Sequence, residues 1–160
     1  MSKFKKFIPV NTPLINNKDA LSVAKTIKSG WISSEGPSVK EFEKKIAKFL
    51  DRRFGCAVSS GTAALDIAVE ALGISKGDEV ILPSFTIISC INQIVRVGAI
   101  PVLVDSDPNT WNMNINQIEE KITMRTKAIM AVHIYGLPVD LDPVISLAKK
   151  YNLKENPIKL

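Results

Sequence analysis

The chain has 160 residues, of which 46% are hydrophobic and 23% charged, the composition of an ordinary globular domain. Its apolar stretches are too short to cross a bilayer, and its basic start has no apolar run behind it, so we expect no signal peptide, no membrane partner and a cytoplasmic location. The net charge of +5 suits an anionic substrate, but the lysines are spread over helix faces, so nucleic acid is not an expected partner.

The cysteines and the single histidine give no indication of a metal site. Cys56 and Cys90 lack the spacing of metal ligands, and no other ligand type gathers around His133. We therefore expect no bound metal, and we interpret both cysteines as buried thiols in a reducing compartment.

The first part of the chain is predicted to be an arm followed by two helices. The arm, 1–17, contains proline, and a helix over 18–29 follows, with Asn17 as its N-cap and Gly30 as its stop. A loop over 31–37 leads to a second helix, which the capping-box pair Ser38 and Glu41 predicts. Apolar residues at helical spacing give this second helix one apolar face: Val39, Phe42, Ile46 and Phe49.

From residue 55 the pattern changes to short apolar strands that alternate with helices. Strands are predicted at 55–59, 79–82, 100–104 and 128–133, and helices at 62–72, 86–97, 114–122 and 141–150. Because the strands are nearly all apolar, they are expected to pair in parallel with both sheet faces covered. The predicted fold class is α/β, with three layers (α/β/α) and a mostly parallel sheet.

Ligands in such sheets bind beyond the carboxyl ends of the strands, which singles out a few loops. One is Ser59-Ser-Gly-Thr-Ala-Ala64, which joins an expected strand to a helix. We predict that the backbone N–H groups of Gly61, Thr62 and Ala63 converge there on one point, an arrangement that attracts phosphate. An ordinary N-cap turn is the alternative, because Ser, Gly and Thr are common caps.

Three other loops offer candidate ligand contacts, each with a structural alternative. Phe85 would stack on a flat cofactor or belong to the core, and His133 would bond a ligand or play a structural part. The 31–37 loop would contact substrate or be a turn with Trp31 anchored in the core. Since parallel strands end on one side, we predict Phe85 and His133 at the same sheet edge as Thr62.

Four ordered motifs carry a family resemblance: 30–43 (GWISSEGPSVKEFE), 60–65 (SGTAAL), 77–86 (GDEVILPSFT) and 132–140 (VHIYGLPVD). With them the chain, from about residue 8 to 154, closely resembles the DegT–DnrJ–StrS sugar aminotransferases, fold-type I enzymes that use pyridoxal 5′-phosphate (PLP). The resemblance implies the large PLP-binding domain of that fold. It also implies that Phe85 and His133 lie in the cofactor site, with Trp31 and Ser33 near the sugar nucleotide. The turn implied to bind the cofactor phosphate comprises Ser60, Gly61, Thr62 and Ala63.

The family's activity then follows as an expectation. Its members transfer an amino group from glutamate to a nucleotide-linked keto-sugar, in polysaccharide or deoxysugar biosynthesis. They are homodimers with active sites at the subunit interface. A related PLP-dependent sugar dehydratase, or a non-catalytic remnant that keeps the fold as a binding or interaction protein, are the alternatives.

The chain departs from the family pattern near its end. In the family, a further strand carries an aspartate that pairs with the pyridine nitrogen, and a later lysine holds PLP covalently; here the chain reads Glu155-Asn-Pro-Ile-Lys-Leu160. We therefore expect no catalytic residue and an inactive isolated chain, as a frame-shifted product, a fragment or half of a split enzyme with a complementing C-terminal half. No substitute is expected among the late lysines: Lys149, Lys150, Lys154 and Lys159.

The organisation expected from this resemblance is one incomplete large domain over residues 1–160. After the arm at 1–17 come a helical segment at 18–50, an α/β core at 51–154 and a divergent tail at 155–160.

Overall fold

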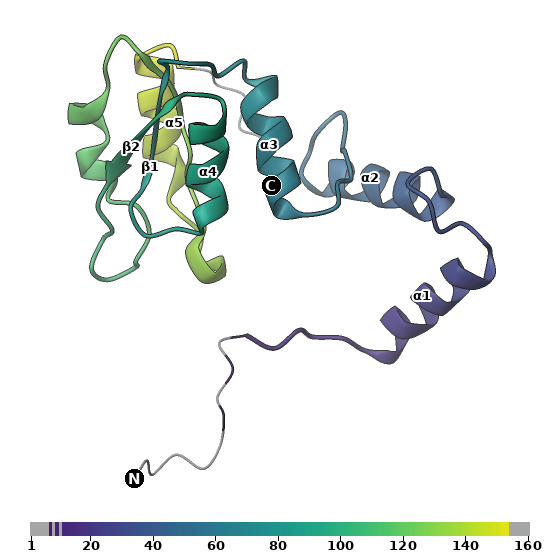
Figure 1. Cartoon of the computed structure of the whole chain (residues 1–160). Helices are drawn as coiled ribbons and strands as arrows, with labels where there is room; N and C mark the ends of the chain where they lie inside the picture. Colours follow the sequence, from purple (N-terminus) through teal and green to yellow (C-terminus); the bar gives the residue numbers. More distant parts are fainter. Residues whose placement is uncertain (1–6, 8, 10, 154–160) are drawn as a thin grey trace. The chain divides into compact units, whose positions relative to one another are not determined.

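The computed structural model describes residues 7, 9 and 11–153 (Figure 1). They belong to two compact units, one within Met1–Ala57 and the other within Val58–Leu160. Among the described residues, no helix is both long enough and apolar enough to pass through a membrane. That same part of the chain contains no group of three or more residues able to hold a metal ion.

The first unit contains helices α1, Asn17–Lys28, and α2, Pro37–Phe49. The cap of α1 is Asn16 rather than the predicted Asn17, so the helix begins one residue early. The Asn16 side chain accepts a hydrogen bond from the Lys18 N–H at 2.8 Å. It also accepts one from the Asp19 N–H at 3.4 Å, and the Asp19 carboxylate in return accepts one from the Asn16 N–H at 2.9 Å. This reciprocal pair is a capping box, and it fixes the start of α1.

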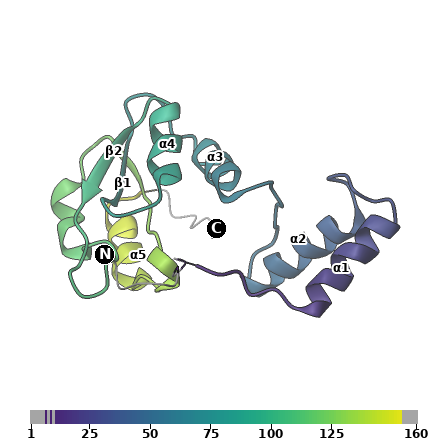
Figure 2. The same ribbon diagram turned by 60° about the horizontal axis from the view of Figure 1, so that its bottom comes forward.

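The capping box predicted for the second helix is wrong. Helix α2 begins at Pro37, its cap Gly36 makes no side-chain bond, and Glu41 pairs instead with Lys45 at 2.6 Å. Proline at the first helical position supplies a suitable φ and has no N–H to satisfy, so no capping side chain is needed. Helices α1 and α2 meet at the hydroxyls of Thr26 and Ser38, 3.4 Å apart (Figure 2).

The strand predicted at 55–59 is absent, and most of that segment is exposed. Its Ala57 N–H donates to the carboxylate of Glu43 on α2, at 2.9 Å, instead of to a neighbouring strand. Gly55 lies against the same helix, where an added Cβ would come within 2.6 Å of the Glu43 carbonyl oxygen. The segment therefore follows α2, and a run of small apolar residues was not sufficient evidence for a strand.

The second unit is built on a parallel sheet of three strands in the order β2-β1-β3. The strands are β1, Glu79–Pro83, β2, Ile100–Val104, and β3, Thr126–Ile129. Strands β1 and β2 agree with the predicted spans, whereas β3 lies earlier than the predicted 128–133. After Ile129 only the Met130 N–H still bonds to β1, at 2.8 Å from the Ile81 oxygen, before the chain turns away.

Side chains alternate across this sheet and create a core on each face. Val80 and Leu82 pack with residues of α3, Gly61–Ala71, and α4, Ile88–Arg96, on one face. On the other face, Ile81 packs with residues of α5, Leu141–Lys150 (Figure 1). Because both faces are covered, the predicted three-layer α/β class with a mostly parallel sheet is confirmed.

The helix predicted over 114–122 is two short 3₁₀ turns, η1, Ile115–Gln117, and η2, Glu119–Lys121. The Gln117 side chain does not return to the cap; its Oε1 accepts from the Asp105 N–H at 2.8 Å. The Gln117 side chain, which the capping pattern predicted to bond the start of the helix, is thus used in a tertiary contact with Asp105. Of the two cysteines, Cys90 is buried as predicted, but Cys56 is exposed because its segment does not enter the sheet.

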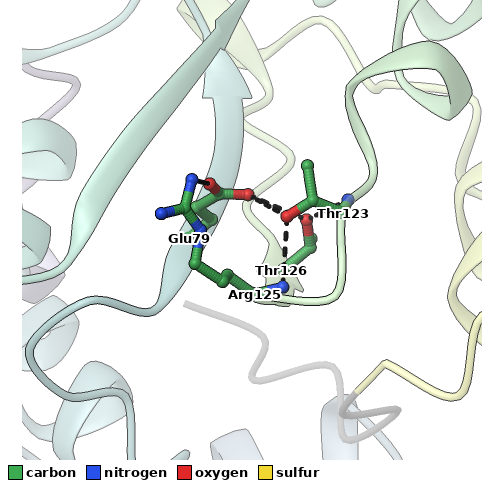
Figure 3. Close-up of polar contacts among 4 residues, drawn as sticks. All are labelled: Glu79, Thr123, Arg125 and Thr126. Atoms are coloured by element: carbon green, nitrogen blue, oxygen red, sulfur yellow. Dashed lines mark hydrogen bonds and ion pairs between the residues drawn. The ribbon is translucent and has the colours of Figure 1, made fainter.

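The amino end of the sheet is closed by a buried carboxylate, that of Glu79, which is 4% exposed. Figure 3 shows Thr123 Oγ1 and Arg125 Nη2 donating to its two oxygens, each at 2.5 Å, with Thr126 Oγ1 at 3.4 Å. The hydrogen bond from Thr123, followed by the charge and bonds of Arg125 and Thr126, lowers the pKa of Glu79 against the opposing effect of burial. A buried carboxylate is tolerated here because its oxygens are satisfied.

Candidate functional site

The candidate site lies at the opposite end of the sheet, where the strands finish. Phe85 follows β1 and Asp105 follows β2, while His133 lies beyond β3 at the start of the 3₁₀ turn η3, Ile134–Gly136. Phe85 and His133 thus both follow carboxyl ends of parallel strands. Parallel pairing brings these loops to one edge of the sheet.

The start of α3 is exposed and keeps two backbone donors unpaired. Ser60 caps the helix, and its Oγ accepts from the Ala63 N–H at 3.2 Å, so that amide is already occupied. The N–H groups of Gly61 and Thr62 have no hydrogen-bond partner among the described residues. A Cβ on Gly61 would meet nothing within 4 Å. An anion therefore has access to two amides, rather than the predicted three, at the positive end of the helix dipole.

A contact between hydroxyls connects this turn to the Phe85 loop. Thr62 Oγ1 lies 3.1 Å from Oγ of Ser89, which is in the first turn of α4, directly after the loop that carries Phe85. The start of α3 therefore lies beside the segment that leaves the carboxyl end of β1. Thr62 and the Phe85 loop share this edge, as predicted.

Two aromatic side chains, those of Trp111 and Tyr135, lie around Phe85. Its ring centroid lies 5.5 Å from that of Trp111 and 6.3 Å from that of Tyr135, and both pairs are tilted. Phe85 is 39% exposed, Trp111 59% and Tyr135 82%, and with Leu137 they line an open depression of about 370 Å³. Phe85 is thus not a fully buried core residue, and part of its ring is free to contact a ligand.

His133 has a structural bond on one side of its ring and an open position on the other. Its Nδ1 accepts from the Val139 N–H at 2.9 Å. In the neutral ring an accepting Nδ1 places the proton on Nε2. The side chain is exposed, and its Nε2 has no partner among the described residues. The two roles considered for His133 are therefore compatible.

Sequence reasoning missed Asn112, which is 6% exposed and binds the loop after His133. Its Nδ2 donates to the carbonyls of Leu137 and Pro138 at 3.2 and 3.4 Å, and its Oδ1 accepts from the Ile134 N–H at 3.2 Å. The turn signal Asp107-Pro-Asn-Thr110 just before it was visible in the sequence. The loop that Asn112 bonds, which lies more than twenty residues further along the chain, was not visible in the sequence.

Trp31 and Ser33, the predicted substrate contacts, belong to the first unit and are exposed there. Trp31 is 51% exposed, so the alternative that anchors it in the core is wrong within that unit. Contact with a substrate stays a prediction for both residues.

The late lysines have the exposed setting that was expected. Lys149 and Lys150 end α5 and are both exposed, and Lys150 Nζ donates to Glu119 Oε1 at 2.5 Å. That bond and the Glu119 charge raise the pKa of Lys150, which keeps the amine protonated. A protonated amine is not a nucleophile, so Lys150 is poorly suited to covalent chemistry. Lys154 and Lys159 lie outside the described residues.

Comparison with known proteins shows which family the chain belongs to. The model of the DegT/DnrJ/EryC1/StrS aminotransferase family matches residues 13–154. The chain belongs to this family. Over 148 residues it is 47% identical to the GDP-perosamine synthase of Escherichia coli O157:H7, covering 92% of this chain and 41% of that enzyme. It is 40% identical over 153 residues to the spore coat polysaccharide biosynthesis protein SpsC of Bacillus subtilis, covering 96% of this chain and 39% of that protein.

A solved structure supports the fold class as well. NtdA of Bacillus subtilis, determined with bound cofactor PMP, superposes with a TM-score of 0.80 at 35% identity, covering 88% of this chain and 33% of NtdA. The α/β unit is therefore the type found in PLP-dependent aminotransferases. The chain spans about two fifths of the length of the curated relatives it matches.

Proposed function

We propose that the chain is the cofactor-binding front portion of a PLP-dependent aminotransferase that acts on nucleotide-linked keto-sugars in polysaccharide or deoxysugar biosynthesis. The observation that carries the proposal is the exposed start of α3, beside the loop of Phe85, where the N–H groups of Gly61 and Thr62 have no partner within the part of the chain that the structure describes. In a member of this family, that arrangement suits the phosphate of PLP.

The residues present fit the cofactor. Gly61 and Thr62 would hold the phosphate through backbone N–H groups, with the Thr62 hydroxyl beside them and Ser60 and Ala63 shaping the turn. The exposed part of the Phe85 ring would contact the pyridine ring, and the His133 Nε2–H would donate to a cofactor oxygen. PLP itself would supply the electron sink, and this chain's residues would position it.

The substrates and assembly are proposed from the relatives. Glutamate would be the amino donor and a nucleotide-linked keto-sugar the acceptor, in a homodimer, with Trp31 and Ser33 near the sugar nucleotide. The sequence likeness to a GDP-perosamine synthase and to a spore coat polysaccharide biosynthesis protein supports this substrate class.

We also propose that these 160 residues alone bind PLP without turnover, and that a complementing C-terminal half would be needed for catalysis. The exposed Lys149 and the ion-paired Lys150 support this view, since neither lies in a setting that would activate an amine. Without turnover the chain would act as a binding protein that keeps the PLP fold.

The test is a PLP titration of the chain carrying Trp31→Phe, so that Trp111 fluorescence alone reports binding. We expect saturable quenching. Gly61→Val should weaken PLP binding about tenfold or more, because its side chain would enter the space above the free amides, where charge-assisted bonds form. Ala71→Val at the exposed far end of α3 is the matched control and should leave the affinity unchanged.

Borohydride reduction followed by mass measurement completes the test. We expect no stoichiometric adduct and no turnover of glutamate with a keto-sugar nucleotide. Unchanged affinity in Gly61→Val would contradict the proposed phosphate site. A single adduct at one lysine together with turnover would contradict the proposal that the isolated chain is inactive.

A further inference from the structure

Asn112 occupies an unusual position, because it is a buried polar residue held by a tight turn of its own. The Asp107 N–H donates to the Asn112 carbonyl at 2.8 Å, and the preceding Trp111 N–H donates to the Asp107 carbonyl at 2.8 Å. Trp111 has φ 62°, in the left-handed region. The Asp107 carboxylate accepts from the N–H groups of Asn109 and Thr110, both at 2.9 Å, so the turn is well tied. This turn fixes where the Asn112 carboxamide lies.

The carboxamide holds the chain that follows His133 from both sides. It accepts from the Ile134 N–H and donates to the carbonyls of Leu137 and Pro138. Between these contacts the backbone is left-handed at Tyr135, φ 49°, and at Gly136, φ 85°. Only a side chain with both a donor and an acceptor makes all these bonds: aspartate lacks the donor, and leucine lacks both groups.

The loop that Asn112 holds leads to Val139, the residue that bonds the His133 imidazole. Val139 is buried, and its N–H donates to His133 Nδ1 at 2.9 Å. The loop therefore closes on its own first side chain, and the His133 ring orientation depends on where Val139 lies. Among the described residues, the Asn112 side chain bonds neither the imidazole nor the Val139 N–H, so its influence on them passes through the loop.

We infer that Asn112 is a positioning residue, which through residues 134–138 holds the His133 imidazole as a neutral Nε2–H donor for an oxygen acceptor of the bound ligand. The ligand part of this inference rests on the proposed function, in which that acceptor belongs to PLP. The positioning part concerns the free chain alone. The two parts are therefore measured separately.

The positioning part is tested by amide hydrogen exchange in the ¹⁵N-labelled chain. In Asn112→Asp, protection of the Val139 N–H should fall about tenfold relative to β1 amides such as that of Ile81. The substitution leaves the acceptor of the Val139 N–H, His133 Nδ1, in place. In His133→Ala the Val139 N–H should lose protection while the Ile134 N–H keeps it. Asn109→Leu is the matched control, because Asn109 lies in the same turn and takes part in it through its backbone N–H; the substitution should change neither amide.

Val139 protection that stays at the wild-type level in Asn112→Asp would overturn the inference. A loss equal to that of the β1 amides would show general destabilisation by the buried charge. Asn112→Ser, which is smaller and uncharged, then repeats the comparison, and Val139 protection that does not fall relative to the β1 amides in that variant overturns the inference. The chain has a single histidine, so its imidazole ¹⁵N signals need no assignment, and in the neutral ring they should report the proton on Nε2.

The ligand part uses PLP as the probe. We expect PLP that quenches Trp111 fluorescence to shift the His133 Nε2 signal as well. Quenching without that shift would overturn the ligand part and leave the proposed function intact. Absence of any quenching would contradict the proposed function and the ligand part together, while the amide exchange would still decide the positioning part.

Discussion

The two ends of the sheet use polar groups in opposite ways. At the amino end, the Glu79 carboxylate has donors on both oxygens, from Thr123, Arg125 and Thr126. At the carboxyl end, by contrast, the amides of Gly61 and Thr62 are unpaired among the described residues.

Hydroxyls and aromatic rings show the same contrast. Thr86 Oγ1 and Ser106 Oγ, which follow β1 and β2, are buried without a hydrogen-bond partner in the described part of the chain. Phe85, Trp111 and Tyr135 are exposed at that end. A satisfied polar cluster contributes to stability, whereas open donors and exposed rings are available to a ligand. The difference fits a stabilising part for the amino end and the ligand-binding part that is proposed for the carboxyl end.

The largest expected effect is on stability, from a change at the amino end. Glu79→Leu should lower the free energy of unfolding by about 2–3 kcal/mol, because it leaves the hydroxyls of Thr123 and the buried Thr126 without their acceptor. Arg125→Leu should cost less, because that side chain is 65% exposed, so that water can replace its donor to the Glu79 oxygen. Urea unfolding measures the loss of stability in both variants. Equal losses would contradict the claim that the Glu79 carboxylate is the centre of this cluster.

A smaller effect is expected from pH. The pKa of Glu79 is lowered in the folded chain, chiefly by the hydrogen bond from Thr123. Its contribution to stability is therefore fully present above its usual value of 4.5 and is lost as the pH falls through the lowered value. Urea unfolding between pH 7 and pH 3 should show this loss, and Glu79→Gln should reduce the slope.

Glu119→Gln is the matched control for that slope. The pKa of Glu119 is also lowered, first by its hydrogen bond with Lys150 and then by that with Tyr151, but this carboxylate is exposed. Its effect on the slope should shrink in high salt, which screens exposed charges. A Glu79 effect that shrinks equally in salt would indicate an ordinary surface pair.

The smallest effects on stability are expected at the carboxyl end. Thr62→Ala removes an exposed hydroxyl that contacts the Ser89 hydroxyl, and Tyr135→Phe changes a side chain that is 82% exposed. Each should change the free energy of unfolding by less than about 0.5 kcal/mol. Thermal unfolding of the two variants provides the measurement. A loss as large as that in Glu79→Leu would remove the contrast between the two ends.

Local patterns predicted the elements of the second unit well, because each depends on short-range signals. The strand at 100–104 and the helix at 141–150 have the predicted bounds, and α3 begins at Gly61, one residue before the predicted start. The segment at 55–59 failed because its N–H pairs with Glu43, a tertiary contact that an apolar run does not reveal.

The same limit applies to the candidate site. Phe85 and His133 were predicted because they follow strands, and strand ends are visible in a sequence. Asn112 was not, because its importance depends on the carbonyls of Leu137 and Pro138, far along the chain. Likewise, the sequence did not reveal that the Ser60 hydroxyl takes the Ala63 amide.

Amide chemical shifts test the central claim, that the carboxyl end of the sheet binds the ligand through the start of α3. Inorganic phosphate and then PLP would be added to the ¹⁵N-labelled chain. We predict that phosphate moves the amides of Gly61 and Thr62 most, and that PLP moves these together with Phe85 and His133, while Glu79 and Thr126 at the amino end stay unchanged. Largest shifts at the amino end, or small shifts spread over the exposed lysines, would contradict the account.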